Sequence, residues 1–391
     1  MRASFVFSSR AYKYKGKYYT VNLTPSTLRK LYFPYCDQLV MCLREKCVDH
    51  VDGLTYAEDK DISYQCAKID ASIDFYLLKR PLLEKTIKKV VRESDYVIAR
   101  MGLSGVIAAK YARKLHKPYV CEVVGPAYQN LFFHSRIGKI AAPYIEKMVK
   151  REIRKAKYVC YVTEKTLQKQ YPTNGYSVGI SDVEILDYHP VNLENRINKI
   201  KNYRPDERLK LVTLGPVDKA MKGQMYVIQA IAELKKENYI FEYHLVGGGN
   251  PEKLIDLAKR LGVEAQLVFA GTVNHEKVFE YLKDMDVYIQ PSLTEGLPRA
   301  LIEAMSIALP CAGSNVDGIP ELLEREMVFE PKDVQGIMRV LKSLDRGTML
   351  RNAEFGFRKA FYFTEDEASR RRKEFWENFI KDNFTKASEE Q

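Results

Sequence analysis

The chain has 391 residues, of which 46% are hydrophobic and 29% are charged, so it has the composition of a globular protein long enough for two domains. Lys and Arg number 62 against 51 Asp and Glu, and the formal net charge of +11 favours an anionic partner such as a phosphorylated ligand, nucleic acid or a membrane surface. No apolar run approaches the roughly 18 to 20 residues that span a bilayer, which argues against an exported or integral membrane protein. The seven widely spaced cysteines are typical of buried thiols in a reducing compartment and predict a cytoplasmic protein.

The N-terminal half begins unusually and then becomes a regular α/β pattern. Residues 12–19 and 28–40 are rich in tyrosine, where a standard strand-and-helix unit would be shorter and plainer. Apolar runs and Gly-containing turns then predict strands at 96–102, 118–125 and 158–163, with helices at 105–117 and 137–156. We therefore expect a first α/β domain over residues 1–195.

A polar stretch separates the two halves. Residues 192–210 are weakly periodic and carry Pro205 just before a strong strand pattern. Such a segment is typical of a linker between domains. We accordingly place the domain boundary between residues 195 and 205.

The second half repeats a cycle of short apolar run, turn and amphipathic helix. The predicted strands are 210–215, 241–249, 266–273, 287–292 and 309–314, and the predicted helices are 225–237, 251–263, 275–285, one starting at Pro298, and 319–325. This alternation indicates parallel βαβ units and a doubly wound sheet over residues 205–363. A last helix, about residues 364–391, has Phe375, Trp376 and Phe379 at helical spacing, and we expect it to dock back on the first domain.

Two carboxylates flank the turn that follows the fourth of these strands. Open parallel sheets bind ligands beyond the carboxyl ends of their strands. In PSLTEGLPRALIEA (291–304), Glu295 lies on the turn and Glu303 lies inside the next helix, about 7 to 8 Å along the axis from Pro298 at about 1.5 Å per residue. The free N–H groups of residues 297–301 would form a cradle for phosphate, so the carboxylates could bracket a diphosphate. Alternatively, Glu295 caps the helix electrostatically and Glu303 is a solvated helix residue.

Lysines occupy the turn after the first strand of this half, LGPVDKAMKGQ (214–224). Gly215 opens the turn, and Lys219 and Lys222 precede the next helix, where a lysine offers a point charge to phosphate. Either lysine could instead be ordinary surface. The next turn, VGGGNP (246–251), does not match GxGxxG spacing, so no dinucleotide fingerprint is indicated.

Metal-binding patterns lack support in the sequence. Asp-x-Asp occurs at 59–61 in a polar loop and at 284–286, where Asp286 is typical of a boundary between helix and strand. The seven cysteines and six histidines form no CxxC, HxxxH or HxH pair. We therefore expect neither a metal nor another cofactor.

The motifs between about Leu209 and Leu341 closely resemble the donor domain of retaining GT-B glycosyltransferases of the "group 1" type, glycosyltransferase family 4. They follow one another as LVTLG...KG, HLVGGGN, LVFAGTV and DVYIQPSLTEGLPRALIEAMSIALPCAGSNVDGIPELL. The family's E-x7-E motif is matched in spacing by Glu295 and Glu303, and the Gly-Ile-Pro-Glu run at 318–321 follows it. The resemblance implies two Rossmann-like domains facing a central cleft, the first holding the acceptor and the second the donor.

The resemblance also implies roles for individual residues. Glu295 would contact the donor sugar, and Lys222 would neutralise the leaving diphosphate. The substrate-binding set would comprise Glu303 at the ribose, Gly296, Leu297 and Pro298 at the diphosphate, Lys219 and Gly215 beside Lys222, Thr272 and Val273 at the base, and Gly125 in the first domain. Transfer would occur with retention and without a metal, whose place the lysine and the helix dipole take.

Two positions depart from the family pattern. Pro216 stands where many relatives have an arginine, which leaves Lys222, assisted by Lys219, as the cation of this turn. Gly125 or Val124 stands where many relatives have a histidine in the N-terminal domain. The contact from that domain to the donor sugar therefore lacks its usual residue.

The predicted function is transfer of a hexosyl-type sugar from a nucleotide sugar, with UDP preferred, to a saccharide or lipid-linked saccharide acceptor in a bacterial surface-polysaccharide pathway. The basic stretches at 85–93, 147–157 and 369–373 would suit an anionic membrane surface, so a peripheral position on the inner face of the cell membrane stays open. We expect no nucleic-acid partner, because the net charge alone does not explain the donor motifs.

Two other functions remain as alternatives. One is another GT-B enzyme, such as a nucleotide-sugar 2-epimerase, although the few histidines argue against it. The other is a non-catalytic nucleotide-sugar-binding protein, which predicts loss of Glu295, Glu303 or Lys222, and all three are present.

Overall fold

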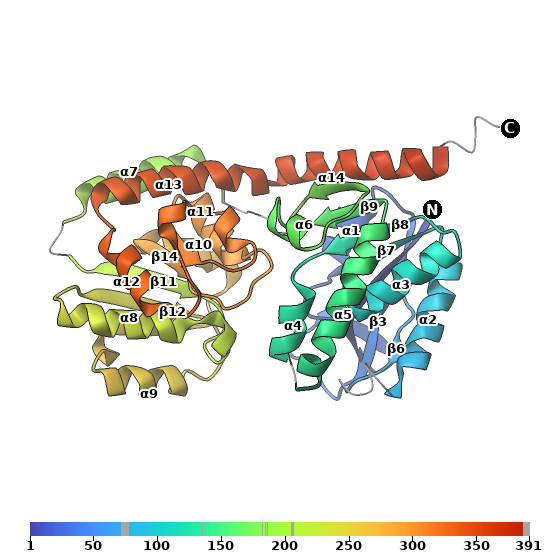
Figure 1. The fold of residues 1–391 in the computed structure, drawn as a ribbon, viewed down its shortest axis with the longest axis horizontal. Helices are drawn as coiled ribbons and strands as arrows, with labels where there is room; N and C mark the ends of the chain where they lie inside the picture. The colour runs from blue at the N-terminus through green and yellow to red at the C-terminus, as the bar shows by residue number, and fades with distance from the viewer. Residues whose placement is uncertain are drawn as a thin grey trace. The chain divides into compact units, whose positions relative to one another are not determined.

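The computed structural model describes residues 1–71, 78–134, 136–181, 183, 185, 187–204 and 207–385. The chain forms two compact units, one made of Met1–Ile180 with Arg371–Gln391 and the other of Ser181–Arg370 (Figure 1). Each unit contains its own largely parallel sheet with helices packed on it. The predicted two-domain α/β fold is therefore confirmed.

The N-terminal unit has parallel strands in the order β10-β9-β8-β7-β1, and β3 lies on the other side of β1. Its strands are β1 (Arg2–Tyr14), β2 (Lys17–Thr20), β3 (Gln38–Cys47), β4 (Thr55–Tyr56), β5 (Ile62–Tyr64), β6 (Ala67–Lys68), β7 (Tyr96–Arg100), β8 (Tyr119–Val123), β9 (Tyr158–Tyr161) and β10 (Tyr176–Gly179). Its helices are α1 (Pro25–Tyr32), α2 (Arg80–Arg92), α3 (Leu103–Lys114), α4 (Ala127–His134), α5 (Arg136–Lys155) and α6 (Thr166–Gln170).

The tyrosine-rich start forms a β-hairpin. Strands β1 and β2 pair antiparallel, with Tyr14 opposite Lys17. The two residues between them, Lys15 and Gly16, have φ values of 47° and 82°. Positive φ at both central positions of a two-residue hairpin turn matches the right-handed twist of the strands. The departure from a plain strand-and-helix unit is thus an antiparallel extension of an otherwise parallel sheet.

The second unit has six parallel strands in the order β13-β12-β11-β14-β15-β16. The strands are β11 (Leu209–Leu214), β12 (Phe241–Val246), β13 (Leu267–Gly271), β14 (Val287–Gln290), β15 (Cys311–Ser314) and β16 (Val328–Phe329). The helices are α7 (Pro190–Asn202), α8 (Gln224–Lys236), α9 (Glu252–Leu261), α10 (His275–Asp284), α11 (Arg299–Ser306), α12 (Val334–Lys342) and α13 (Arg346–Ala360). The predicted element at 319–325 is only the 3-10 turn Ile319–Glu321.

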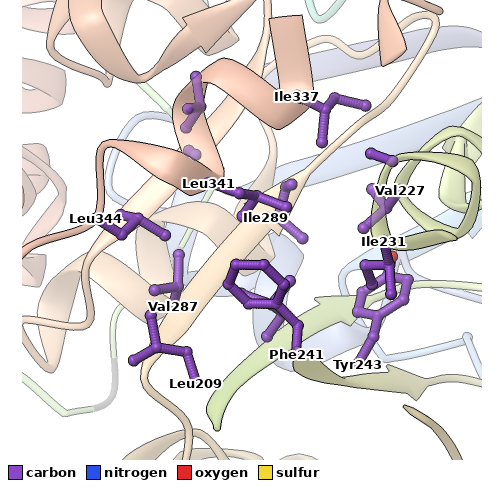
Figure 2. Close-up of a cluster of buried hydrophobic side chains, with 14 of the residues drawn as sticks. Leu209, Val227, Ile231, Phe241, Tyr243, Val287, Ile289, Ile337, Leu341 and Leu344 are labelled. Carbon is purple, nitrogen blue, oxygen red and sulfur yellow. The ribbon is translucent and has the colours of Figure 1, made fainter. Parts of the chain in front are cut away.

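Buried hydrophobic side chains cover both faces of the sheet of this unit, with Leu211 and Ile289 in one cluster and Val212 and Tyr288 in the other. Figure 2 shows Leu209, Phe241, Val287 and Ile289 of the strands against Val227 of α8 and other side chains of that layer. Strands β11 and β14 are buried at most positions because both faces of a doubly wound sheet are covered. This packing holds the carboxyl ends of β11 and β14 side by side.

The boundary between the units differs from the predicted one. The division lies between Ile180 and Ser181, and the predicted linker contains α7, which belongs to the second unit. Helix α7 is anchored there because Ile200 enters the core and the Arg196 guanidinium donates to the backbone oxygen of Met285 at 2.6 Å. Burial lowers the pKa of Arg196 to about 10. Residues 205 and 206 of the predicted linker lie outside the described residues.

The C-terminal helix α14 (Glu365–Ile380) contributes aromatic side chains to the N-terminal unit. Phe375, Trp376 and Phe379 are buried in one cluster with Tyr96, and the Trp376 ring stacks on Tyr35 with centroids 5.3 Å apart. The helical spacing noted in the sequence thus reflects a packed face. Residues 386–391 of the predicted terminal helix lie outside the described residues. Within the described part of the chain, no helix combines the length and apolarity needed to cross a bilayer.

Candidate active site

The strand order of the second unit reverses direction at β11. The chain passes from β11 to β12 on one side, and β14 later pairs with the other side of β11 (Figure 1). In open parallel sheets, ligands bind at such a reversal, beyond the carboxyl ends of the strands. The two turns that meet there are residues 215–223, after β11, and 291–298, after β14. These are the turns that carry the predicted lysines and the first predicted glutamate.

The two turns interlock through their backbones. The Leu293 N–H donates to the backbone oxygen of Met221 at 2.8 Å. Gly223, with φ 71°, lies so close to the other turn that a Cβ placed on it would be 1.9 Å from the Pro291 oxygen. Only glycine permits both this conformation and this approach. The position of Lys222, one residue earlier, is set by this contact.

Lys222 and Glu295 form an ion pair at this junction. The Lys222 Nζ lies 2.8 Å from Oε2 of Glu295, and their side chains are 21% and 20% exposed. The Ser292 hydroxyl donates to the same oxygen at 3.2 Å. Because both side chains are partly shielded from water, the attraction between the Lys222 ammonium and the Glu295 carboxylate is stronger than at the open surface. This attraction favours one geometry of the pair at the edge of the site.

A series of buried side-chain hydrogen bonds leads to the Lys222–Glu295 pair through Ser292. The Gln290 amide donates to the Ser292 hydroxyl at 2.8 Å, and the Tyr288 hydroxyl donates to the Gln290 side-chain oxygen at 2.5 Å. The Ser314 hydroxyl donates to the backbone oxygen of Ser292 at 2.6 Å. These side chains come from β14, its following turn and β15. A fully bonded polar chain of this kind restricts the position of Glu295.

Asp317 holds the backbone of the same turn. Its Oδ2 accepts hydrogen bonds from the Glu295 N–H at 2.7 Å and from the Thr294 hydroxyl at 3.2 Å. Burial raises the pKa of Asp317, and the charge of Glu295 adds to this effect. Asp317 itself has φ 47°, an uncommon conformation for a residue with a side chain. Asp317 and Ser292 were not among the residues predicted from the sequence; the signal for Asp317 was an acidic residue just before the Gly-Ile-Pro-Glu run.

Glu303 is buried rather than solvated. It lies in α11 and is 4% exposed, which excludes the alternative of an ordinary solvated helix residue. Both Glu303 and Glu295 contribute, after burial, to raising the pKa of Tyr288, so the two carboxylates act on the same buried hydroxyl. Helix α11, which carries Glu303, packs against β14, the strand that precedes the Glu295 turn.

Helix α11 begins one residue later than predicted. Pro298 precedes the helix with extended backbone (φ −75°, ψ 108°), and Arg299 is the first helical residue. The helix has no side-chain cap hydrogen bond. Gly296 accepts a backbone hydrogen bond from Gly318 at 3.0 Å, and Leu297 packs against the core. The start of α11 therefore faces the turn that carries Glu295.

The remaining predicted residues of this unit lie on neighbouring turns. Gly215 donates its N–H to the Val246 oxygen at 2.8 Å, next to the aliphatic chain of Lys222. Lys219 is 59% exposed and pairs with Asp218 at 2.9 Å, so it stands farther out than Lys222. A pocket of about 360 Å³ is lined by Lys219 and Gly223 together with residues of α9.

Thr272 and Val273 follow β13, which is an edge strand of the sheet. A Cβ built on Gly248 would lie 3.0 Å from the Thr272 hydroxyl, and Val273 packs against the core. Both therefore lie at the carboxyl edge, on the side of β12 away from Lys222. Gly125 is partly buried and follows β8 in the N-terminal unit.

The two Asp-x-Asp segments have structural roles. Asp59 and Asp61 both bind the guanidinium of Arg29, at 2.6 and 3.0 Å, and the Arg29 hydrogen bond lowers the pKa of Asp59. Asp286 accepts the Lys210 N–H at 2.9 Å and ties β14 to β11, as expected for a boundary residue. No group of three His, Cys, Asp or Glu side chains is placed to hold a metal ion among the residues that the structure covers.

Sequence comparison finds related proteins of known family. The "Glycosyl transferases group 1" family model matches residues 195–353. Protein CapJ of Staphylococcus aureus is 30% identical over 345 residues, which cover 87% of this chain and 85% of CapJ. The amylovoran biosynthesis glycosyltransferase AmsK of Erwinia amylovora is 34% identical over 136 residues, 32% of this chain and 33% of AmsK.

Solved structures share the fold over the whole chain. HepE of Anabaena in complex with UDP superposes with a TM-score of 0.62 at 15% identity, covering 97% of this chain and 99% of HepE. The lipopolysaccharide outer core galactosyltransferase WaaB superposes with a TM-score of 0.65 at 15% identity, covering 99% and 100%. Together with the near full-length similarity to CapJ, these findings show that the chain belongs to the group 1 glycosyltransferases, with the two-domain GT-B fold and relatives in bacterial polysaccharide biosynthesis.

Proposed function

We propose that this glycosyltransferase is a retaining enzyme of glycosyltransferase family 4. It would transfer a hexosyl-type sugar from a nucleotide sugar to a growing or lipid-linked polysaccharide in the cytoplasm. UDP is the preferred nucleotide of the donor. The observation that carries the proposal is the Lys222–Glu295 ion pair at the reversal point of the donor-domain sheet. HepE, a structural neighbour, was solved with UDP and with UDP-glucose, which supports a nucleotide-sugar donor here.

The leaving diphosphate would be stabilised by Lys222 and by the start of α11. The Lys222 ammonium lies next to the turn 291–298, and the first N–H groups of α11 have no acceptor inside the helix. A cation and a helix N-terminus aimed at the developing negative charge lower the energy of the transition state for departure of the nucleotide. Gly215 and Lys219 would line the same side. This arrangement would supply the charge stabilisation that a bound metal gives in other enzymes.

The two glutamates would bind hydroxyl groups on either side of that diphosphate. Glu295 is placed to accept from hydroxyls of the transferred sugar, and Glu303 from those of the ribose. On binding, the diphosphate would compete with Glu295 for the Lys222 ammonium. The Glu295 carboxylate would keep its hydrogen bond from Ser292, and its backbone N–H would stay bonded to Asp317. Glu295 is therefore proposed as an orienting group and not as a nucleophile.

The other binding residues would complete the donor site. The backbone at Gly296, Leu297 and Pro298 would surround the diphosphate, and that at Thr272 and Val273 would face the base. Gly125, at the end of β8, would lie beside the acceptor or the donor sugar in the N-terminal unit.

The test is incubation of the full chain with UDP-, GDP- and ADP-sugars, with and without lipid-linked saccharide. The proposal expects one donor to raise the unfolding temperature, to release nucleoside diphosphate and to yield a product whose anomeric configuration, read by NMR, matches the donor. An inverted product would contradict retention. Conversion of the donor sugar to its 2-epimer without acceptor would identify an epimerase, and binding without turnover for every acceptor would identify a non-catalytic protein.

A further inference from the structure

The cavity of about 360 Å³ in the second unit lies between the turn after β11 and helices α8 and α9, and its volume is within the range of small-molecule sites. It is lined by residues 217–220 and 223–225 and by residues of α9 between 253 and 260. Helices α8 and α9 lie next to each other (Figure 1) and contribute to the hydrophobic cluster on one face of the sheet, whereas α11, which carries Glu303, contributes to the cluster on the other face. The cavity, here called the α8–α9 pocket, is therefore distinct from the proposed diphosphate site.

The floor of the α8–α9 pocket is apolar and continuous with the core. Val217 of the turn and Leu254 of α9 are buried in the same cluster, and Met225 of α8 and Leu257 of α9 pack against it. Because these side chains are held by close packing, the floor has a defined shape. The flexible thioether of Met225 can adapt to a ligand. An aromatic ring or a short aliphatic group placed on this floor would remove apolar surface from water, which favours binding.

The rim of the pocket carries two cations that have no partner. Lys253 and Arg260 are exposed and lie seven residues apart on α9, so they stand on the same side of the helix. Neither side chain forms an ion pair or a hydrogen bond with another residue that the structure describes. Asp256 lines the pocket between them, whereas Lys219 pairs with Asp218 at 2.9 Å. The rim therefore favours an anionic group, and the planar fork of Arg260 matches the oxygens of a phosphate.

The pocket shares a wall with the turn that carries Lys222. Ala220 and Gly223 both line the pocket, and Lys222 stands between them in the chain. Gln224 lines it as well, and its amide donates to the backbone oxygen of Gly215 at 3.3 Å. An anion in the pocket would thus lie close to the turn at which the diphosphate is proposed to bind. Two anions held near the same turn repel each other, so each weakens the binding of the other.

We propose that the α8–α9 pocket binds a small organic phosphate with an apolar body, and that this ligand weakens binding of the nucleotide-sugar donor. The apolar body would cover the floor, and the phosphate would bind Lys253 and Arg260. A neutral apolar molecule would leave both cations without a partner, and inorganic phosphate would leave the floor in contact with water. The second part of the inference rests on the proposed function, because it concerns the affinity for the donor.

Isothermal titration of the full chain with phenyl phosphate, without donor or acceptor, tests the site. Phenyl phosphate carries an aromatic ring and a phosphate, whereas benzyl alcohol carries only the ring and inorganic phosphate only the anion. We expect phenyl phosphate to bind at least about tenfold more tightly than either. Equal affinity for phenyl phosphate and either of the other two compounds would overturn the inference, because the floor or the rim would then contribute nothing.

Substitutions on α9 locate the bound phenyl phosphate. Replacing Lys253 and Arg260 together with Ala should weaken its binding about tenfold, because two exposed ion pairs are lost. Leu257→Asn should also weaken binding about tenfold, because the floor loses apolar surface. Asp256→Asn should strengthen binding about threefold, because a charge of the same sign as the ligand is removed.

Matched substitutions outside the pocket serve as controls. Replacing Lys236 and Lys259 with Ala makes the same change in net charge at exposed residues that do not line the pocket, and Leu261→Asn repeats the apolar change on α9. These variants should bind phenyl phosphate like the wild type, and equal losses in both sets would overturn the inference. A cooperative thermal unfolding transition shows that each variant is folded.

Saturation with UDP separates the proposed coupling from direct competition. UDP should weaken the binding of phenyl phosphate by about three- to tenfold and no further, and saturating phenyl phosphate should weaken the binding of UDP by the same factor. Complete loss of phenyl phosphate binding in saturating UDP would show that both ligands occupy one site and would overturn the inference. Unchanged affinities would overturn it as well.

The proposed function is tested separately by turnover of a nucleotide sugar without phenyl phosphate, which replacement of Lys253 and Arg260 should leave unchanged. Phenyl phosphate binding that depends on these two residues, without any turnover, would overturn the proposed function and leave the binding site standing. Turnover without any binding of phenyl phosphate would overturn the inference alone.

Discussion

The Lys222 ammonium and the Glu295 carboxylate lie 2.8 Å apart, although they belong to turns that follow different strands and are 73 residues apart in the chain. Each group compensates the charge of the other at the edge of the site. A diphosphate arriving between β11 and β14 would exchange one anionic partner of Lys222 for another. Under the proposed function, Lys222 would then supply the positive charge that stabilises the leaving group.

Lys222→Ala should reduce kcat for nucleotide release by about 10² to 10³, because one preorganised charge at the leaving group is lost. The measurement is steady-state release of nucleoside diphosphate with saturating donor. Lys236→Ala is the matched control, since Lys236 is an exposed lysine of α8 that pairs with Glu233. A Lys222→Ala enzyme with wild-type kcat would contradict the leaving-group role.

Glu303→Gln should weaken UDP binding by about 10- to 100-fold, because hydrogen bonds to a charged group are worth roughly 1.5 to 3 kcal/mol. Calorimetric titration with UDP and with 2′,3′-dideoxy-UDP distinguishes loss of the ribose contact from a general loss of folded structure. The wild type should discriminate strongly between the two ligands, and Glu303→Gln only weakly. Glu295→Gln, the matched control, should keep the discrimination; if Glu303→Gln keeps it as well, Glu303 does not bind the ribose.

Gly223→Ala should destabilise the second unit by roughly 3 kcal/mol. The added Cβ would meet the Pro291 oxygen at 1.9 Å, and Gly223 itself has a φ of 71°. Gly262→Ala is the control for backbone conformation alone: its φ is 68°, but no atom lies within 4 Å of the added Cβ. That variant should lose only about 1 kcal/mol. Chemical denaturation compares the two, and equal losses would show that strain in the backbone, rather than contact between the two turns, dominates.

Asp317→Asn should make folding less dependent on pH. Burial raises the pKa of Asp317 in the folded state above its ordinary value of 3.8, so the folded protein holds this proton more tightly than the unfolded chain. Its contribution to stability is therefore present below pH 3.8 and is lost as the pH rises through the raised pKa. The asparagine oxygen still accepts from the Glu295 N–H, so the variant should gain stability relative to wild type as the pH rises through that window. A pH-independent difference between the two unfolding curves would contradict the raised pKa.

The fold of the second unit was predictable because its signals are local. Alternating apolar runs and amphipathic helices specify parallel βαβ units, and most strands and helices occur at the predicted positions. The domain boundary was not predictable in the same way. Helix α7 has the polar composition of a linker, and only its buried contacts through Arg196 and Ile200 assign it to the second unit.

The residue types on the turns after β11 and β14 can be read from the chain, since a motif and its spacing are properties of the chain. Only the folded structure shows that Lys222 pairs with Glu295, that Glu303 is buried, and that Asp317 holds the Glu295 turn. Burial and ion pairing depend on neighbours that the sheet brings together. Those neighbours are tens of residues away along the chain, where no local pattern records them.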